Sequence, residues 1–221
     1  FQEHFNQRHQ YAQDWKTRTA QPVIGYLCTY FPEEIAYAAG MLPVRVLGGH
    51  EPQDVAERHI PTMYCPFSRD VLAQGLLGKY NYLDGLVDCF TSVHMRNVFG
   101  SWVLNIPLKY NYYVYTPTDV RGARVKPYWA IQLAKLKKSL EEFIGHSISE
   151  SSLDAAIDVY NQNRRLLRQI YELRKSECPP VTGAECMEMV ISSQVMDKRE
   201  HNYLLTTALE DLQHRKMGRE T

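Results

Sequence analysis

The sequence GYLCTYFPEE, residues 25–34, places a cysteine at the point where a strand gives way to a helix. The residues from Val23 to Leu27 form a short, apolar, β-prone run, and Pro32 followed by two glutamates is typical of a first helical turn. Cys28 therefore lies at the predicted carboxyl end of a strand. Ligands gather at that end in open α/β sheets, and the amide groups of a helix start favour a thiolate over a thiol.

Two segments downstream repeat this arrangement of strand, cysteine and helix. Cys65 stands directly before a proline and a helix-like run, and the strand-like run from Leu83 to Val87 leads into Cys89. Strands that alternate with short helices indicate a parallel sheet, whose carboxyl strand ends meet at one edge. We therefore predict an α/β fold over residues of about 20–120, a parallel sheet flanked by helices, with Cys28 and Cys65 converging at its carboxyl edge.

The second half of the chain follows a helical pattern from Pro127 onward. Apolar residues recur at steps of three and four, first before Gly145 and then in a second predicted helix from Ser152 to Lys175. The sequence TGAE at 182–185 is a capping-box pattern, and it opens a third helical segment from Met187 to Met217 that we expect to bend near Asp197. The predicted division is an α/β region with an N-terminal helix at residues 1–122 and a helical layer at residues 123–221.

Composition restricts the functional classes open to the chain. Its 221 residues include 25 Lys and Arg against 25 Asp and Glu, which argues against a nucleic-acid-binding or membrane-surface protein. No stretch approaches the ~20 apolar residues of a membrane span, and neither a glycine-rich dinucleotide motif nor a Walker motif occurs. No signal peptide precedes Gln2, so we expect a cytoplasmic protein. Because neither nucleotide motif occurs, we expect any ATP to bind elsewhere than on this chain.

The five cysteines lack the regular spacing of a disulfide scaffold, so we expect reduced thiols. Most buried cysteines are small apolar core residues, and Cys178 and Cys186 fit that interpretation. Cys28 and Cys65 differ because each lies beside a predicted helix start, where amide groups directed at a sulfur tune iron–sulfur sites. The chain contains no Cys-x-x-Cys pair and no ferredoxin run, so its residues alone indicate such a site only through this placement.

Four stretches of the chain follow one another at set distances: GYLCTYFPEE at 25–34, AAGMLPVR at 38–45, CPFSR at 65–69 and LDG at 83–85. In the order and spacing of these stretches the chain resembles the 2-hydroxyacyl-CoA dehydratases and their benzoyl-CoA reductase relatives. The resemblance implies the N-terminal part of a core iron–sulfur subunit, with a second α/β domain beyond the given chain. It also implies that Cys28 and Cys65 are two of three cysteine ligands of a four-iron four-sulfur cluster.

The third ligand is expected in the later domain. Relatives often carry a cysteine where this chain has Ser92, and Cys89 is the nearby candidate. The resemblance further implies a hetero-oligomer with a paralogous core subunit and an ATP-hydrolysing activator subunit. His59 and His94, with Arg58 and Arg96 beside them, are candidates to face a thioester or a CoA phosphate, although exposed His and Arg in loops are more often only solvated.

Three functions remain open at this stage. The first is a subunit of an ATP-dependent benzoyl-CoA reductase that passes low-potential electrons through the cluster to an aromatic acyl-CoA, favoured by the likeness of the Cys28 and Cys65 segments. The second is a subunit of a 2-hydroxyacyl-CoA dehydratase, in which one electron makes a ketyl radical that eliminates water. The third is a non-catalytic α/β scaffold. Trp129, Tyr160 and Tyr171 in the predicted helical layer also indicate an interface with a partner subunit.

Overall fold

A parallel sheet forms the centre of the computed structural model, which describes residues 1–49 and 52–215. The strand order is β2-β1-β3-β4, and every neighbouring pair is parallel. The strands are β1 (Val23–Tyr26), β2 (Leu42–Arg45), β3 (Gly85–Cys89) and β4 (Tyr110–Val114). The predicted α/β class with a parallel sheet is confirmed.

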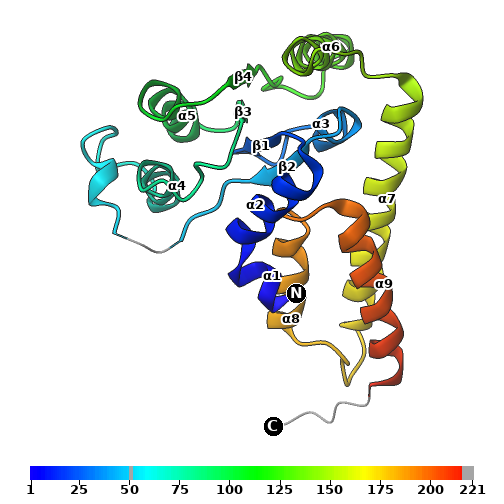
Figure 1. Ribbon diagram of the computed structural model, residues 1–221. Coiled ribbons are helices and arrows are strands. Elements are labelled where there is room, and N and C mark those ends of the chain that lie inside the picture. Colours follow the sequence, from blue (N-terminus) through cyan, green and yellow to red (C-terminus); the bar gives the residue numbers. More distant parts are fainter. Residues whose placement is uncertain (50–51, 216–221) are drawn as a thin grey trace.

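Helices cover both faces of the sheet (Figure 1). Successive residues of β3 point to opposite faces, so Leu86 packs with Trp102 on one side while Val87 packs with Leu136 on the other. The first face carries α2 (Arg8–Thr19), α4 (Pro66–Leu76) and α5 (Val93–Asn105), and the second carries α3 (Glu33–Ala38) and α6 (Val125–Ile144). The short α1 (Gln2–Asn6) precedes α2, and the 3-10 turn η1 (Asp54–Ala56) precedes α4. Among the described residues, no helix is long and apolar enough to cross a membrane.

The helical layer consists of α7 (Glu150–Leu173), α8 (Gly183–Ser192) and α9 (Lys198–His214), with α7 and α9 side by side (Figure 1). The predicted capping box opens α8: Thr182 Oγ1 accepts the Glu185 amide at 3.2 Å, and Glu185 Oε2 accepts the Thr182 amide at 2.8 Å. The single bent helix predicted here is instead two helices, because Asp197 caps a new one. Its predicted end, Met217, lies outside the described residues. The division at residue 122 stays a prediction, and α6 packs on the sheet.

Asp84 closes the amino edge of the sheet, opposite the cysteines. Its side chain accepts the Val23 amide at 3.0 Å and forms ion pairs with Lys16 at 2.7 Å and Lys109 at 2.9 Å. Burial would raise the pKa of this carboxyl, but the hydrogen bonds from these three partners outweigh burial and lower the pKa below its ordinary value. The LDG stretch is therefore a structural joint that ties α2, β1 and β4 to β3.

Replacing Asp84 with asparagine tests this joint. We expect Asp84→Asn to lower the free energy of unfolding by about 1–3 kcal/mol, since the group that both ammonium groups contact loses its negative charge and one of its two acceptor oxygens. The deficit should shrink as the pH falls, because a carboxyl with a lowered folded-state pKa stabilises the fold above its unfolded pKa and loses that contribution as the pH falls through the folded value.

Urea unfolding at several pH values measures the effect. Asp119→Asn is the matched control, because the Asp119 pair with Arg121 is exposed and exposed ion pairs contribute little to stability. Equal losses in the two variants would contradict the joint.

Candidate functional site

Cys28 lies in the turn between β1 and α3, and its side chain is buried. Its Sγ accepts a hydrogen bond from the Tyr30 amide at 3.3 Å, and its carbonyl accepts one from the Phe31 amide at 3.1 Å. The Phe31 ring stacks on Tyr26 with centroids 5.2 Å apart, which fixes the turn to the last residue of β1. The turn that carries the sulfur is therefore held by backbone hydrogen bonds and by the stacked rings of Tyr26 and Phe31.

Cys65 is the N-cap of α4 and is half-buried. Its Sγ accepts the Ser68 amide at 3.4 Å and lies 2.8 Å from Ser68 Oγ. Pro66 takes the first helical position, where the missing amide leaves no internal hydrogen bond unmade. The cysteine thus occupies the place that Ser or Asp usually takes at a helix start, with donors directed at its sulfur.

His94 connects the Cys65 segment to α5. Its Nδ1 accepts the Cys65 amide at 3.2 Å, and its ring stacks on Tyr64 with centroids 4.5 Å apart and 10° between the planes. An Nδ1 that accepts a hydrogen bond assigns the proton of the neutral ring to Nε2. The sequence offered His94 as a residue that faces substrate or solvent, in a helix after the third strand; its role against Cys65, 29 residues away, had no local signal.

The remaining cysteines have other environments. Cys89 is fully buried in the same apolar cluster as Cys28, and burial, then the nearness of Cys28, raises the pKa of its thiol. Ser92 caps α5 by accepting the Met95 amide at 3.2 Å. Cys186 is buried in α8 as predicted, whereas Cys178 is exposed, so the prediction of a core residue is wrong for Cys178. Across residues 1–49 and 52–215, no three His, Cys, Asp or Glu side chains gather in a way that holds a metal ion.

Asp88 is a polar residue at this edge that the sequence pattern did not single out. It is 0% exposed, and neither carboxylate oxygen has a hydrogen-bond partner among the described residues. Burial raises the pKa of Asp88 to about 7. Its neighbour in the β4 register is Tyr113, whose buried hydroxyl also lacks a hydrogen-bond partner within the described part of the chain. The one available signal was an acidic residue inside the apolar strand GLVDC.

Comparison with known proteins places the chain among its relatives. The family model of the 2-hydroxyglutaryl-CoA dehydratase D-component matches residues 28–221. The chain belongs to this family. A benzoyl-CoA reductase subunit from Thauera aromatica is 32% identical over 197 residues, which are 88% of this chain and 51% of that protein.

Two dehydratase subunits are similar to this chain at comparable sequence identity. The beta subunit of (R)-2-hydroxyglutaryl-CoA dehydratase from Acidaminococcus fermentans is 30% identical over 86% of this chain and 49% of its own length. The beta subunit of (R)-phenyllactyl-CoA dehydratase from Clostridium sporogenes is 27% identical, over 88% and 52% respectively. The chain thus spans about half the length of the curated relatives that it matches.

The link between His94 and Cys65 is tested by His94→Phe, which keeps a ring to stack on Tyr64 and removes the acceptor nitrogen. We expect the alkylation rate of Cys65 by iodoacetamide to rise about fivefold, because the lost hydrogen bond had restrained the start of α4. Quantitative mass spectrometry of the Cys65 peptide measures that rate. His59→Phe, at an exposed histidine of the preceding loop, is the control. A rate unchanged in His94→Phe would refute the restraint.

Proposed function

We propose that this chain is a core subunit of an enzyme that acts on an acyl-CoA with low-potential electrons, and that Cys28 and Cys65 ligate a four-iron four-sulfur cluster. The observation that supports this most is that each cysteine sulfur accepts a backbone amide hydrogen bond, Cys28 in the turn before α3 and Cys65 at the start of α4. That the two sulfurs converge at the carboxyl edge of the sheet is part of the proposal. The chain also belongs to the dehydratase D-component family, and the resemblance to that family implies that this pair of cysteines ligates a cluster.

The donor set suits this group. Thiolate sulfur is the ordinary ligand of iron–sulfur clusters, and amide hydrogen bonds to the sulfurs adjust the cluster potential. When bound, the cluster supplies one-electron transfer at low potential. The residues of the chain do the rest: the stack of Phe31 on Tyr26 fixes the Cys28 turn, and His94 restrains the Cys65 amide. Further ligands come from outside the pair, with the later domain as our proposed source.

Reduction of benzoyl-CoA is the reaction that we propose first. It draws support from the 32% identity to the benzoyl-CoA reductase subunit from Thauera aromatica. We propose that the electrons come from a separate ATP-hydrolysing activator subunit and that a paralogous core subunit accompanies this chain. Dehydration of a 2-hydroxyacyl-CoA is the second candidate, because the family model carries that name and dehydratase beta subunits reach 30% identity.

Turnover by the anaerobically purified complex separates the alternatives. With benzoyl-CoA, ATP and a strong reductant, the reductase yields a cyclic diene thioester, whereas the dehydratase yields an enoyl-CoA from a 2-hydroxyacyl-CoA. Iron and acid-labile sulfide are measured in the same preparation. A complex free of iron and sulfide that converts neither substrate would leave the scaffold function in place of our proposal.

Cysteine substitutions test the ligand assignment. Cys65→Ser should abolish the visible iron–sulfur absorbance while the chain still folds, because an alkoxide or hydroxyl oxygen is a poor substitute for thiolate at iron. Cys186→Ser should keep the absorbance and lower the free energy of unfolding by about 1–3 kcal/mol, since it buries a hydroxyl among apolar side chains.

Both variants are purified without oxygen, and their absorbance spectra and melting temperatures are compared. The exposed Cys178 supplies a further control, Cys178→Ser, which should change neither quantity. Full cluster content in Cys65→Ser, or cluster loss confined to Cys186→Ser, would place the metal on other cysteines.

A further inference from the structure

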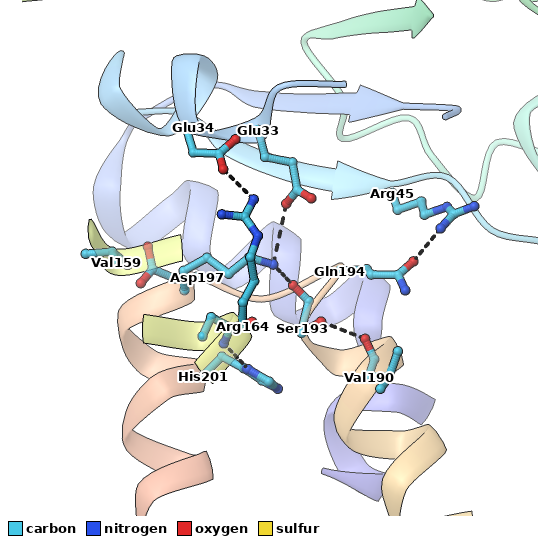
Figure 2. A network of polar contacts seen from close by, with 12 residues as sticks. Glu33, Glu34, Arg45, Val159, Arg164, Val190, Ser193, Gln194, Asp197 and His201 are labelled. Atoms are coloured by element: carbon cyan, nitrogen blue, oxygen red, sulfur yellow. Dashed lines mark hydrogen bonds and ion pairs between the residues drawn. The ribbon is translucent and has the colours of Figure 1, made fainter. Parts of the chain in front are cut away.

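A buried lysine joins the helical layer to the segment that follows Cys28. Lys198 is the first residue of α9 and is 5% exposed. Its Nζ donates a hydrogen bond to the Ser193 carbonyl, lies 3.4 Å from Glu33 Oε2, and sits 5.0 Å from the ring centroid of Tyr160. Figure 2 shows Glu33 and Ser193 on either side of this contact. The ammonium group is thus enclosed by α3, α7 and the turn between α8 and α9.

Glu33 depends on this lysine for its charge balance. Its Oε2 is buried, and its ion-pair partner is Lys198 Nζ at 3.4 Å. Tyr26 and Tyr160 lie close to the same carboxylate: burial first, and then the Glu33 charge, raises the pKa of both phenols well above the ordinary value. The positive charge of Lys198 also contributes, after burial, to lowering the pKa of His201.

Three other pairs of residues also join α7 and the turn between α8 and α9 to α3 or β2, and Figure 2 draws the pairs of Arg164 with Glu34 and of Arg45 with Gln194. Arg164 of α7 forms an ion pair with Glu34, and the Tyr37 hydroxyl lies 3.4 Å from Asp197 Oδ1. Arg45, at the end of β2, donates to Gln194 Oε1 at 3.1 Å, and its amide donates to the Gln194 carbonyl at 2.9 Å. The Cys28 turn is therefore bracketed by Tyr26 before it and the Glu33 and Glu34 contacts after it.

A charged pair is not what the stability of this packing requires. Replacing both members of a buried ion pair with apolar side chains of similar volume is often neutral or stabilising, whereas removing Lys198 alone leaves the Glu33 carboxylate without its ion-pair partner. The charge of Lys198 fixes the direction of the Glu33 side chain, because the carboxylate is attracted to the ammonium group. Glu33 is the first residue of α3, and it follows the turn in which the Tyr30 amide donates to the Cys28 sulfur.

We propose that Lys198, acting through Glu33, is a positioning residue for the Cys28 turn, so that the helical layer sets the geometry of this sulfur. The ligand role of Cys28 rests on the proposed function, whereas the ordering of the turn is a property of this chain alone. Loss of the lysine charge lets the Glu33 side chain turn toward solvent, and residues 27–32 then become less ordered. The sheet and the other three contacts, of Arg164, Tyr37 and Arg45, remain.

Hydrogen exchange in the full-length protein tests the ordering of the turn. In Lys198→Met and in Glu33→Gln we expect amide exchange in the peptide 27–36 to accelerate about tenfold, and the double variant to add little, as coupled neighbours do. Lys198→Arg should restore slow exchange. Lys137→Met is the matched control, since Lys137 pairs with Glu141 on the surface of α6. If Lys198→Met does not fold, Glu33→Gln carries the test.

The same variants, purified anaerobically with their partner subunits, test the effect on the metal site. We expect faster bleaching of the iron–sulfur absorbance by a chelator and a changed electron paramagnetic resonance spectrum of the reduced cluster, both restored in Lys198→Arg. Unchanged exchange at 27–36 overturns the proposal, and so do an unchanged spectrum and bleaching rate, which leave Lys198 a merely structural role. Wild-type protein without a cluster refutes the proposed function instead, and hydrogen exchange then decides alone whether Lys198 orders the turn.

Discussion

The reciprocal hydrogen bonds between Val23 and Asp84 set the register of the two central strands. The Asp84 amide donates to the Val23 carbonyl at 2.9 Å, and the Asp84 carboxylate accepts the Val23 amide at 3.0 Å. Because β1 and β3 are parallel and adjacent, a fixed register at their amino ends also fixes where they end. The positions of Cys28 and Cys89 at the far edge therefore depend on an interaction at the opposite edge. The ion pairs of Asp84 with Lys16 and Lys109 thus lie at the amino edge of the sheet, away from Cys28 and Cys89.

The helical layer contains two kinds of buried polar network. His201 is neutral: Nδ1 accepts from Asn163 at 2.8 Å, Nε2 lies 3.1 Å from the Met189 carbonyl, and burial lowers its pKa to about 3. That network joins α7, α8 and α9 to one another without charge. The charged contact of Lys198 joins the layer to the Cys28 segment. The interior of the layer is thus held by neutral hydrogen bonds, and its buried charge lies at the boundary with the sheet.

Local signals in the sequence predicted much of the fold. Cys65 before Pro66 indicated a helix start, TGAE indicated a capping box, and Gly145 ends α6 in the left-handed region at φ +80°. The interface argument from aromatic residues succeeded less well, since Tyr160 is 3% exposed and packs within the chain, whereas Tyr171 is 45% exposed. A helical pattern shows that a face is apolar and leaves open what covers it.

The site was harder to predict because its supporting contacts join distant segments. His94 against Cys65 and Lys198 against Glu33 leave no periodic pattern, and a buried ion pair looks in sequence like two surface charges. For Asp88 the strand position could be predicted from the sequence, but the lack of hydrogen-bond partners among the described residues could not. Propensity and capping act within a few residues, whereas these contacts exist only after the sheet has brought the segments together.

The two cysteines are supported from opposite faces of the sheet. Cys28 packs with the cluster of α3 and α6 and is tied through α3 to the helical layer, whereas Cys65 starts α4 and is restrained by α5 on the other face. The sheet is the one element that both supports share. A small slide of either helix layer moves one sulfur and leaves the other in place. The contact of Lys198 with Glu33, which ties the helical layer to α3, therefore bears on the geometry of the Cys28 sulfur as well as on the stability of the chain.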